Sequence, residues 1–218
     1  MIRFRRHRLP TSIQLPPWWR RHGARLMLLS VALIGVVCAR SLPPASAPAK
    51  VSEGDWGRYH DRSFQVVRII DGDTLDIAVP DRDKPTTRIR LWGVDSPEIA
   101  HGKEPSMHFG PEATRFAEQS LSGRRVHIVL SPKQSRDRYG RLLAYVFLER
   151  GGIMFNERLI EEGFAYADRR FDHHYEDRFE ALENEAHRRG RGLWKDLIPA
   201  DMPSWRQRYE ERMRRTED

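Results

Sequence analysis

The amino-acid sequence predicts an α+β domain, mainly β, in which five strands form a small closed barrel of the OB type with about three helices. Three β-rich runs follow one another between residues 64 and 93, and an Asp-Gly turn joins the first two. A helical segment separates them from two further strand-like runs, and helical patterns follow the fifth run. Strands followed by helices also fit a generic α+β domain, so the barrel is the more specific of two interpretations.

The strands are expected at residues 64–70, 75–79, 86–93, 126–130 and 142–148. The turn at Asp71-Gly72 requires a positive φ in a tight hairpin, which predicts that conformation for Gly72. The last run is continuously apolar, so that strand is expected to be buried on both faces.

Three helices are expected at 111–121, 155–162 and 175–189. In the first, Ala113, Phe116, Ala117 and Leu121 fall on one face, with Pro111 in the first turn. Residues 203–218 are expected to form a charged helix, to which the sequence assigns no function.

The chain divides into a basic leader (1–47), a linker (48–62), the folded domain (63–198) and a charged C-terminal tail (199–218). The leader joins arginines to an apolar segment at 26–39, which is shorter than the ~20 residues of a spanning helix. We expect an exported domain that is periplasmic, secreted or membrane-anchored, with residues 26–39 as a signal peptide or as an uncleaved anchor. A chance apolar helix behind a basic tail is the alternative.

The positive net charge of +7 belongs to the leader, which holds eight arginines and no acid. The remainder has 30 lysines and arginines against 31 acids, a net charge of −1. Cys38, in the leader, is the only cysteine, so disulfides, thiolate zinc sites and cysteine nucleophiles are excluded for the folded domain.

Acids and arginines cluster at the ends of the first three strands. Asp73, Asp95 and Glu98 offer hard oxygen ligands, which select Ca²⁺ or Mg²⁺ over zinc or copper. Arg90 and Arg141 stay charged and can grip a phosphate with two hydrogen bonds. Together these residues suit hydrolysis of a phosphodiester, because cations stabilise the charge that grows on phosphorus and a carboxylate can position water.

Each of these motifs alone has a purely structural interpretation, as a turn, a helix start or a solvated loop. Their joint occurrence in one small domain favours a shared site. Strict alternation would place Arg90 and Asp95 on opposite faces of a strand, so they can cooperate only if the strand ends or bulges near Gly93.

These motifs resemble the thermonuclease (micrococcal or staphylococcal nuclease-like) family over residues 64–196, about three fifths of the chain. The matching segments are 70–74 (IDGDT), 90–98 (RLWGVDSPE), 109–113 (FGPEA), 137–145 (DRYGRLLAY), 156–157 (NE) and 192–194 (GLW). The resemblance implies an OB-type barrel and a Ca²⁺-dependent endonuclease that hydrolyses DNA and RNA.

The resemblance also implies a role for each matching residue. Asp73 and Asp95 would bind the metal, with Ser96 contributing its backbone carbonyl. Glu98 would orient or deprotonate water, while Arg90 and Arg141 would hold the phosphate. Tyr139 matches a tyrosine near the terminal phosphate of the nucleotide, and Arg138 precedes it in the same substrate-binding loop.

Two departures from the family pattern are visible. Ser96 replaces the usual threonine, and residues 168–171 lack the tyrosines that flank the nucleotide base. Two other functions fit the same barrel: a non-catalytic nucleic-acid-binding module and a domain that binds another ligand or a protein. We also expect Lys133 and Arg136 to join the loop arginines in a phosphate-binding patch.

Overall fold

The computed structural model describes residues 53–100, 102 and 105–217. They lie within one compact unit, Pro48–Asp218. The predicted leader, its apolar segment 26–39 and the first part of the predicted linker lie outside the described residues. Within the described part, every helix is too short or too polar to cross a membrane.

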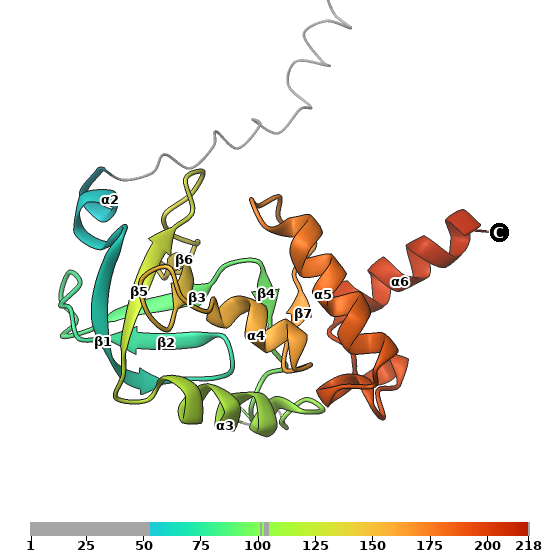
Figure 1. Cartoon of the computed structure of the whole chain (residues 1–218). Helices are drawn as coiled ribbons and strands as arrows, with labels where there is room; N and C mark the ends of the chain where they lie inside the picture. The colour runs from blue at the N-terminus through green and yellow to red at the C-terminus, as the bar shows by residue number, and fades with distance from the viewer. Residues whose placement is uncertain (1–52, 101, 103–104, 218) are drawn as a thin grey trace, which may run out of the picture. The chain divides into compact units, whose positions relative to one another are not determined.

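Five strands close into a barrel in the order β1-β2-β3-β6-β5, which confirms the predicted architecture (Figure 1). All neighbours are antiparallel except β3 and β6, which run parallel. The strands are β1 (Arg62–Ile69), β2 (Thr74–Ile77), β3 (Thr87–Leu91), β5 (Arg125–Leu130) and β6 (Leu142–Phe147). Each matches a predicted strand to within a few residues.

The barrel interior is filled by branched aliphatic side chains. Leu75 and Ile77 of β2, Ile89 of β3 and Ile128 of β5 are almost completely buried. In β6 the first five residues are all buried, as the apolar run predicted. Burial of these side chains is the main stabilising contribution to the barrel, at roughly 1.5–3 kcal/mol for each large one.

The three predicted helices are present as α3 (Gly110–Leu121), α4 (Phe155–Glu161) and α5 (Glu176–Arg188). In α3 the buried face contains Ala113, Ala117 and Leu121, as the 3.6-residue period predicted. Figure 1 shows α3 crossing one end of the barrel, whereas α4 and α5 lie to one side of the barrel.

Helix α2 (Glu53–Tyr59) lies within the predicted linker, so the linker prediction is wrong for that segment. Tyr59 is fully buried, and its hydroxyl shares a hydrogen bond of 3.0 Å with Thr87 of β3. The linker prediction followed the Pro- and Ala-rich composition of the preceding residues and overlooked Tyr59 as a buried residue of a helix. At the other end, α6 (Ser204–Glu217) follows two short 3₁₀ helices, η1 (Gly192–Trp194) and η2 (Pro199–Asp201).

A small second sheet, which the sequence did not predict, pairs β4 (Val94–Asp95) with β7 (Tyr166–Ala167). Gly93 separates β3 from β4 with a φ of +78°, and a Cβ there would lie 2.6 Å from the ring of His173. The strand therefore turns at Gly93, which removes the alternation constraint on Arg90 and Asp95.

Candidate active site

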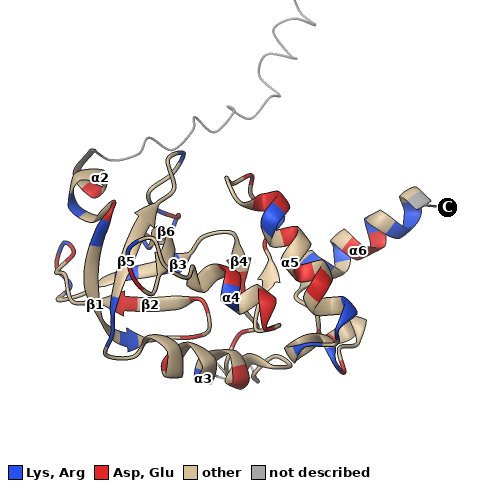
Figure 2. Ribbon diagram, viewed as in Figure 1, with Lys and Arg blue, Asp and Glu red and all other residues tan. Residues whose placement is uncertain are grey.

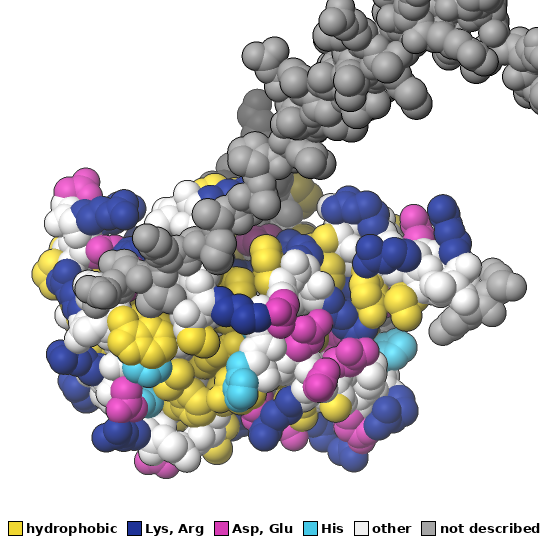
Figure 3. Space-filling model, turned by 90° about the horizontal axis from the view of Figure 1, so that it is seen from above, with side chains coloured by type: hydrophobic (Ala, Val, Ile, Leu, Met, Phe, Trp, Pro, Cys, Tyr) yellow, Lys and Arg dark blue, Asp and Glu magenta, His cyan; other side chains and the backbone are white. Residues whose placement is uncertain are grey.

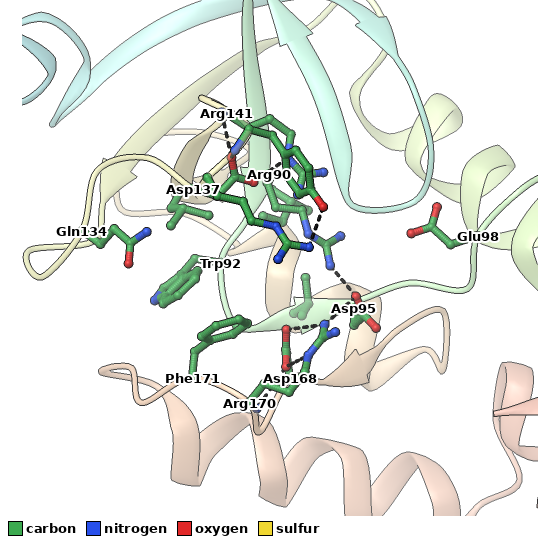
Figure 4. A pocket seen from close by; sticks show the side chains of 16 residues that line it. Arg90, Trp92, Asp95, Glu98, Gln134, Asp137, Arg141, Asp168, Arg170 and Phe171 are labelled. Carbon is green, nitrogen blue, oxygen red and sulfur yellow. Dashed lines mark hydrogen bonds and ion pairs between the residues drawn. The ribbon is translucent and has the colours of Figure 1, made fainter. Parts of the chain in front are cut away.

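A pocket of about 610 Å³ opens at the end of β3 (Figure 4). Its walls come from β3 and the turn into β4, from the loop between β5 and β6, and from the segment after β7. Six of the eight predicted site residues line it: Arg90, Asp95, Glu98, Arg138, Tyr139 and Arg141. Asp73 and Ser96 lie directly behind this wall, through the contacts described next.

Arg90 connects the two carboxylates that the sequence proposed as metal ligands. Its position opposite Thr74 in the β2–β3 ladder places it beside Asp73, with which Nη1 forms an ion pair. Nη2 donates to Oδ1 of Asp95 over 2.5 Å. One guanidinium thus bridges both acids, which keeps them close despite their like charge.

Asp73 is held rigidly because its side chain is almost completely buried. Oδ2 accepts a hydrogen bond of 2.6 Å from the backbone N–H of Ser96, and Oδ1 accepts one of 3.0 Å from the hydroxyl of Thr74. These contacts bring three members of the predicted metal set, Asp73, Asp95 and Ser96, into one cluster.

Gly72 is needed here for a reason other than the predicted one. Its φ is not positive, which corrects the hairpin expectation. Instead, a Cβ at this position would lie 2.8 Å from Cβ and Oγ of Ser96 and 2.9 Å from Cβ of Ala113. The glycine lets the β1–β2 turn pack directly against the segment after β4.

Glu98 lies to the right of Arg90 and Asp95 in Figure 4. Partial desolvation and the charge of the neighbouring Asp71 raise its pKa, while Arg90 opposes the shift. Burial likewise raises the pKa of Asp71, against the attraction of Arg90. In the sequence, Asp71 has only the signature of a turn residue.

Asp137 organises the loop that carries Arg141. Its Oδ1 accepts from the backbone N–H groups of Tyr139 and Arg141, at 2.9 and 3.0 Å, and its Oδ2 accepts from Nε of Arg141 at 2.6 Å. Tyr139 is 68% exposed, and the Arg138 guanidinium lies over its ring at 4.7 Å from the centroid. The loop therefore presents a fixed guanidinium and an exposed aromatic ring to the pocket.

The predicted phosphate patch is wrong for Arg136. This side chain is mostly buried and donates to Asp55 of α2, to Asp81 and to the carbonyl of Gly140. With two carboxylates around it, the Arg136 charge is already neutralised, so it braces the loop instead of facing solvent. Lys133 forms an exposed ion pair with Asp172.

Residues after β7 complete the pocket, in a segment that the sequence marked only as a departure from the family pattern. Arg170 pairs with Asp168 at 2.7 Å and with Oδ1 of Asp95 at 3.0 Å. Phe171 is 48% exposed and lies 5.3 Å from the ring of Trp92. The resemblance to the family marked this segment, but no role was assigned to Asp168, Arg170 or Phe171, because they reach the site through the β4–β7 pairing.

The donor set fits a hard cation in its chemistry, since carboxylate and carbonyl oxygens are the ligands that Ca²⁺ takes. In the described part of the chain, no three His, Cys, Asp or Glu side chains form a ready cluster for a metal ion. The guanidinium of Arg90 pairs with both Asp73 and Asp95, so both carboxylates already have a cationic partner.

The fold and the site define a class of small five-stranded barrel proteins in which strand ends gather acids and arginines around an open pocket. The chain belongs to the family described as staphylococcal nuclease homologue, whose model matches residues 88–196.

Curated relatives agree with this assignment. The chain is 36% identical to the thermonuclease of Staphylococcus hyicus over 169 residues, which cover 77% of this chain and 95% of the relative. It is 34% identical to the thermonuclease of Staphylococcus intermedius over 172 residues, 78% and 95% of the two chains. An uncharacterized endonuclease of Escherichia coli O157:H7 is 30% identical over 144 residues, 66% and 84% of the two chains.

Proposed function

We propose that the chain is a calcium-dependent nuclease that hydrolyses phosphodiester bonds of DNA and RNA. The observation that carries the proposal is the convergence of Arg90, Asp95, Glu98 and Arg141 on one pocket, with Asp73 directly behind it. The thermonucleases and the endonuclease among the relatives support the same activity.

Asp73 and Asp95, with the backbone carbonyl of Ser96, would hold Ca²⁺. When bound, the ion would supply positive charge that stabilises the phosphorane-like transition state. Arg90 contacts the same two carboxylates, so it would turn from them toward a substrate phosphate as the site fills.

Arg141 is suited to the transition state because Asp137 holds its Nε and backbone N–H in place. The terminal nitrogens of the guanidinium then meet two oxygens of the phosphate at once, which costs little reorganisation during the reaction. Arg138 and Tyr139 would bind the neighbouring part of the nucleotide.

Glu98 would position the attacking water and accept its proton. The raised pKa of this carboxylate makes it a better proton acceptor than an ordinary glutamate. In Figure 4 no dashed line joins Glu98 to the other pocket residues drawn, which would leave its carboxylate available to water.

Binding would depend on a few local cations, because the folded domain has no net positive charge. Basic and acidic side chains are mixed on the face shown in Figure 3. The pocket instead combines arginines with aromatic rings, Tyr139, Trp92 and Phe171, that can stack on bases. Phe171 would thus take the part played in the family by the missing tyrosines.

The test is incubation of the full chain with single- and double-stranded DNA and RNA, in millimolar-scale Ca²⁺ and in a chelator. Cleavage of DNA and RNA that needs Ca²⁺ is expected. Binding without cleavage under these conditions would instead establish the non-catalytic nucleic-acid-binding module.

A further inference from the structure

Helix α6 lies beyond the part of the chain that matches the family model, yet it contacts the candidate metal ligand. Trp205, in the first turn of α6, donates its indole Nε1–H to Oδ2 of Asp95 over 2.7 Å. The two residues are 110 positions apart in the sequence. Oδ1 of the same carboxylate forms ion pairs with Arg90 and Arg170.

We propose that Trp205 is a positioning residue for the metal site, through which α6 fixes the orientation of the Asp95 carboxylate. The inference rests on the proposed function, because it assigns Asp95 to Ca²⁺. A neutral N–H donor suits this task. It holds one carboxylate oxygen in place without bringing a further positive charge against a divalent cation.

The helix is held firmly enough to act in this way. Glu183 of α5 is almost completely buried and accepts from Arg206 of α6 and from Arg169, each over 2.8 Å. Its other oxygen accepts from the backbone N–H of Ala167 over 2.9 Å. One buried carboxylate thus anchors both α6 and strand β7.

Strand β7 in turn pairs with β4, where Ala167 lies opposite Val94 and Tyr166 lies opposite Asp95. The backbone of Asp95 and its side-chain donor are therefore fastened to the same buried group. Arg169 also bonds to Tyr209, one helical turn after Trp205, and Figure 2 shows charges of both signs along α6. The position of Trp205 relative to Asp95 is set by several contacts at once.

Trp194 of η1 provides a matched control. It is as buried as Trp205, at 7% against 9% exposure, and both rings meet Tyr166 at an interplanar angle of 83°. In contrast to Trp205, its Nε1 has no hydrogen-bond acceptor among the described residues. A Phe substitution removes similar packing at either position but removes a carboxylate hydrogen bond only at Trp205.

The experiment measures Ca²⁺ binding to the full chain by isothermal titration calorimetry, with folding checked by thermal unfolding. We expect Trp205→Phe to weaken Ca²⁺ binding by about tenfold, within the range for loss of a partner behind a metal ligand. Trp194→Phe should bind Ca²⁺ as the wild type does. Trp205→His, which retains a ring N–H, should recover part of the loss.

Equal Ca²⁺ affinities for Trp205→Phe and Trp194→Phe would overturn the inference while leaving the proposed function intact. A wild-type chain that neither binds Ca²⁺ nor cleaves nucleic acid would overturn the proposed function, and the inference with it.

A second measurement does not depend on the folding of any variant. The indole N–H resonance of Trp205 in the wild-type protein should be protected from exchange and should move when Ca²⁺ is added. An indole resonance that exchanges rapidly and stays in place at saturating Ca²⁺ would overturn the inference.

Discussion

Arg90 and Arg141 line the same pocket but are held in different ways. Arg90 is bound through both terminal nitrogens by Asp73 and Asp95, whereas Arg141 is bound by Asp137 through Nε. Arg141 therefore combines a side chain fixed at Nε with a place in the pocket lining. This difference makes Arg141 the better candidate for contact with the transition state.

Arg141→Lys is expected to lower kcat by on the order of 10² or more with little change in nucleic-acid affinity, because an ammonium cannot match two phosphate oxygens at once. Steady-state kinetics in Ca²⁺ and direct binding measurements check this. Arg150→Lys is the control, since Arg150 is exposed, pairs with Asp61 and lies outside the pocket lining. A normal kcat for Arg141→Lys would show that Arg141 does not stabilise the transition state.

Glu98→Gln should also lower kcat by on the order of 10² or more, because the amide cannot accept a proton from water. The same substitution should raise the stability of the folded protein at neutral pH. The pKa of Glu98 is raised in the folded protein, so its ionisation costs stability as pH rises through that pKa, and the cost persists at neutral pH. Urea unfolding without Ca²⁺ should show that the variant is at least as stable as the wild type at pH 7. At pH 4, where the wild-type glutamate is largely protonated, this advantage should be lost. A variant that cleaves normally would refute the role of Glu98.

Phe171 offers an exposed ring beside Trp92 at the edge of the pocket. Stacking of a base on an aromatic ring contributes roughly 1–3 kcal/mol, so Phe171→Leu should weaken binding of single-stranded DNA by about tenfold. Phe171→Tyr should bind as the wild type does. Fluorescence anisotropy with a short labelled strand measures both, and equal affinities for the Leu and Tyr variants would exclude stacking at this position.

At the scale of single elements, helix α2 reaches the site through the β5–β6 loop. Asp55 of α2 accepts from Arg136 and from Ser135, and Arg136 in turn donates to the carbonyl of Gly140, next to Arg141. A segment expected to be a linker thus braces the loop that carries a candidate catalytic residue.

Asp55→Asn should lower the free energy of unfolding by about 1–3 kcal/mol at pH 7, because charged hydrogen bonds to Arg136 are lost. Burial opposes ionisation of Asp55, but hydrogen bonds from Arg136 and Ser135 outweigh it and lower its pKa. The stabilisation is therefore present above the pKa of the unfolded chain and disappears as pH falls through the lower pKa of the folded state.

Urea unfolding of wild type and Asp55→Asn at pH 7 and near pH 3 measures this difference. The difference in the free energy of unfolding between the two proteins should be smaller near pH 3 than at pH 7. Asp83→Asn, an exposed acid in the β2–β3 connection, is the control and should leave stability unchanged. A difference that increases on acidification would contradict the stabilising role of the ionised Asp55 carboxylate.

At the scale of the whole molecule, we propose that the folded domain works outside the cytoplasm. The basic leader and the apolar segment 26–39 support this proposal, and the domain that follows them contains no cysteine. Cell fractionation and protease access on intact cells should find the domain exported, either released or anchored through residues 26–39. A full-length product confined to the cytoplasm would refute the proposal.

The sequence by itself determined the five barrel strands, the helices α3, α4 and α5 and the two motifs that hold Asp73, Arg90 and Asp95. These features have local signatures, because side-chain periodicity and turn residues act over a few positions. The β2–β3 register then brings Arg90 to Asp73 through a short connection.

Only the tertiary structure decided the rest of the site. The β4–β7 pairing, the burial of Arg136 between Asp55 and Asp81, and the bond from Trp205 to Asp95 each join segments far apart in the chain. Two-residue strands and single tryptophans carry no periodic pattern, so nothing local distinguishes them from loop residues. Their partners are chosen when the barrel closes and α5 and α6 pack against it, because burial then leaves each polar group few partners within reach.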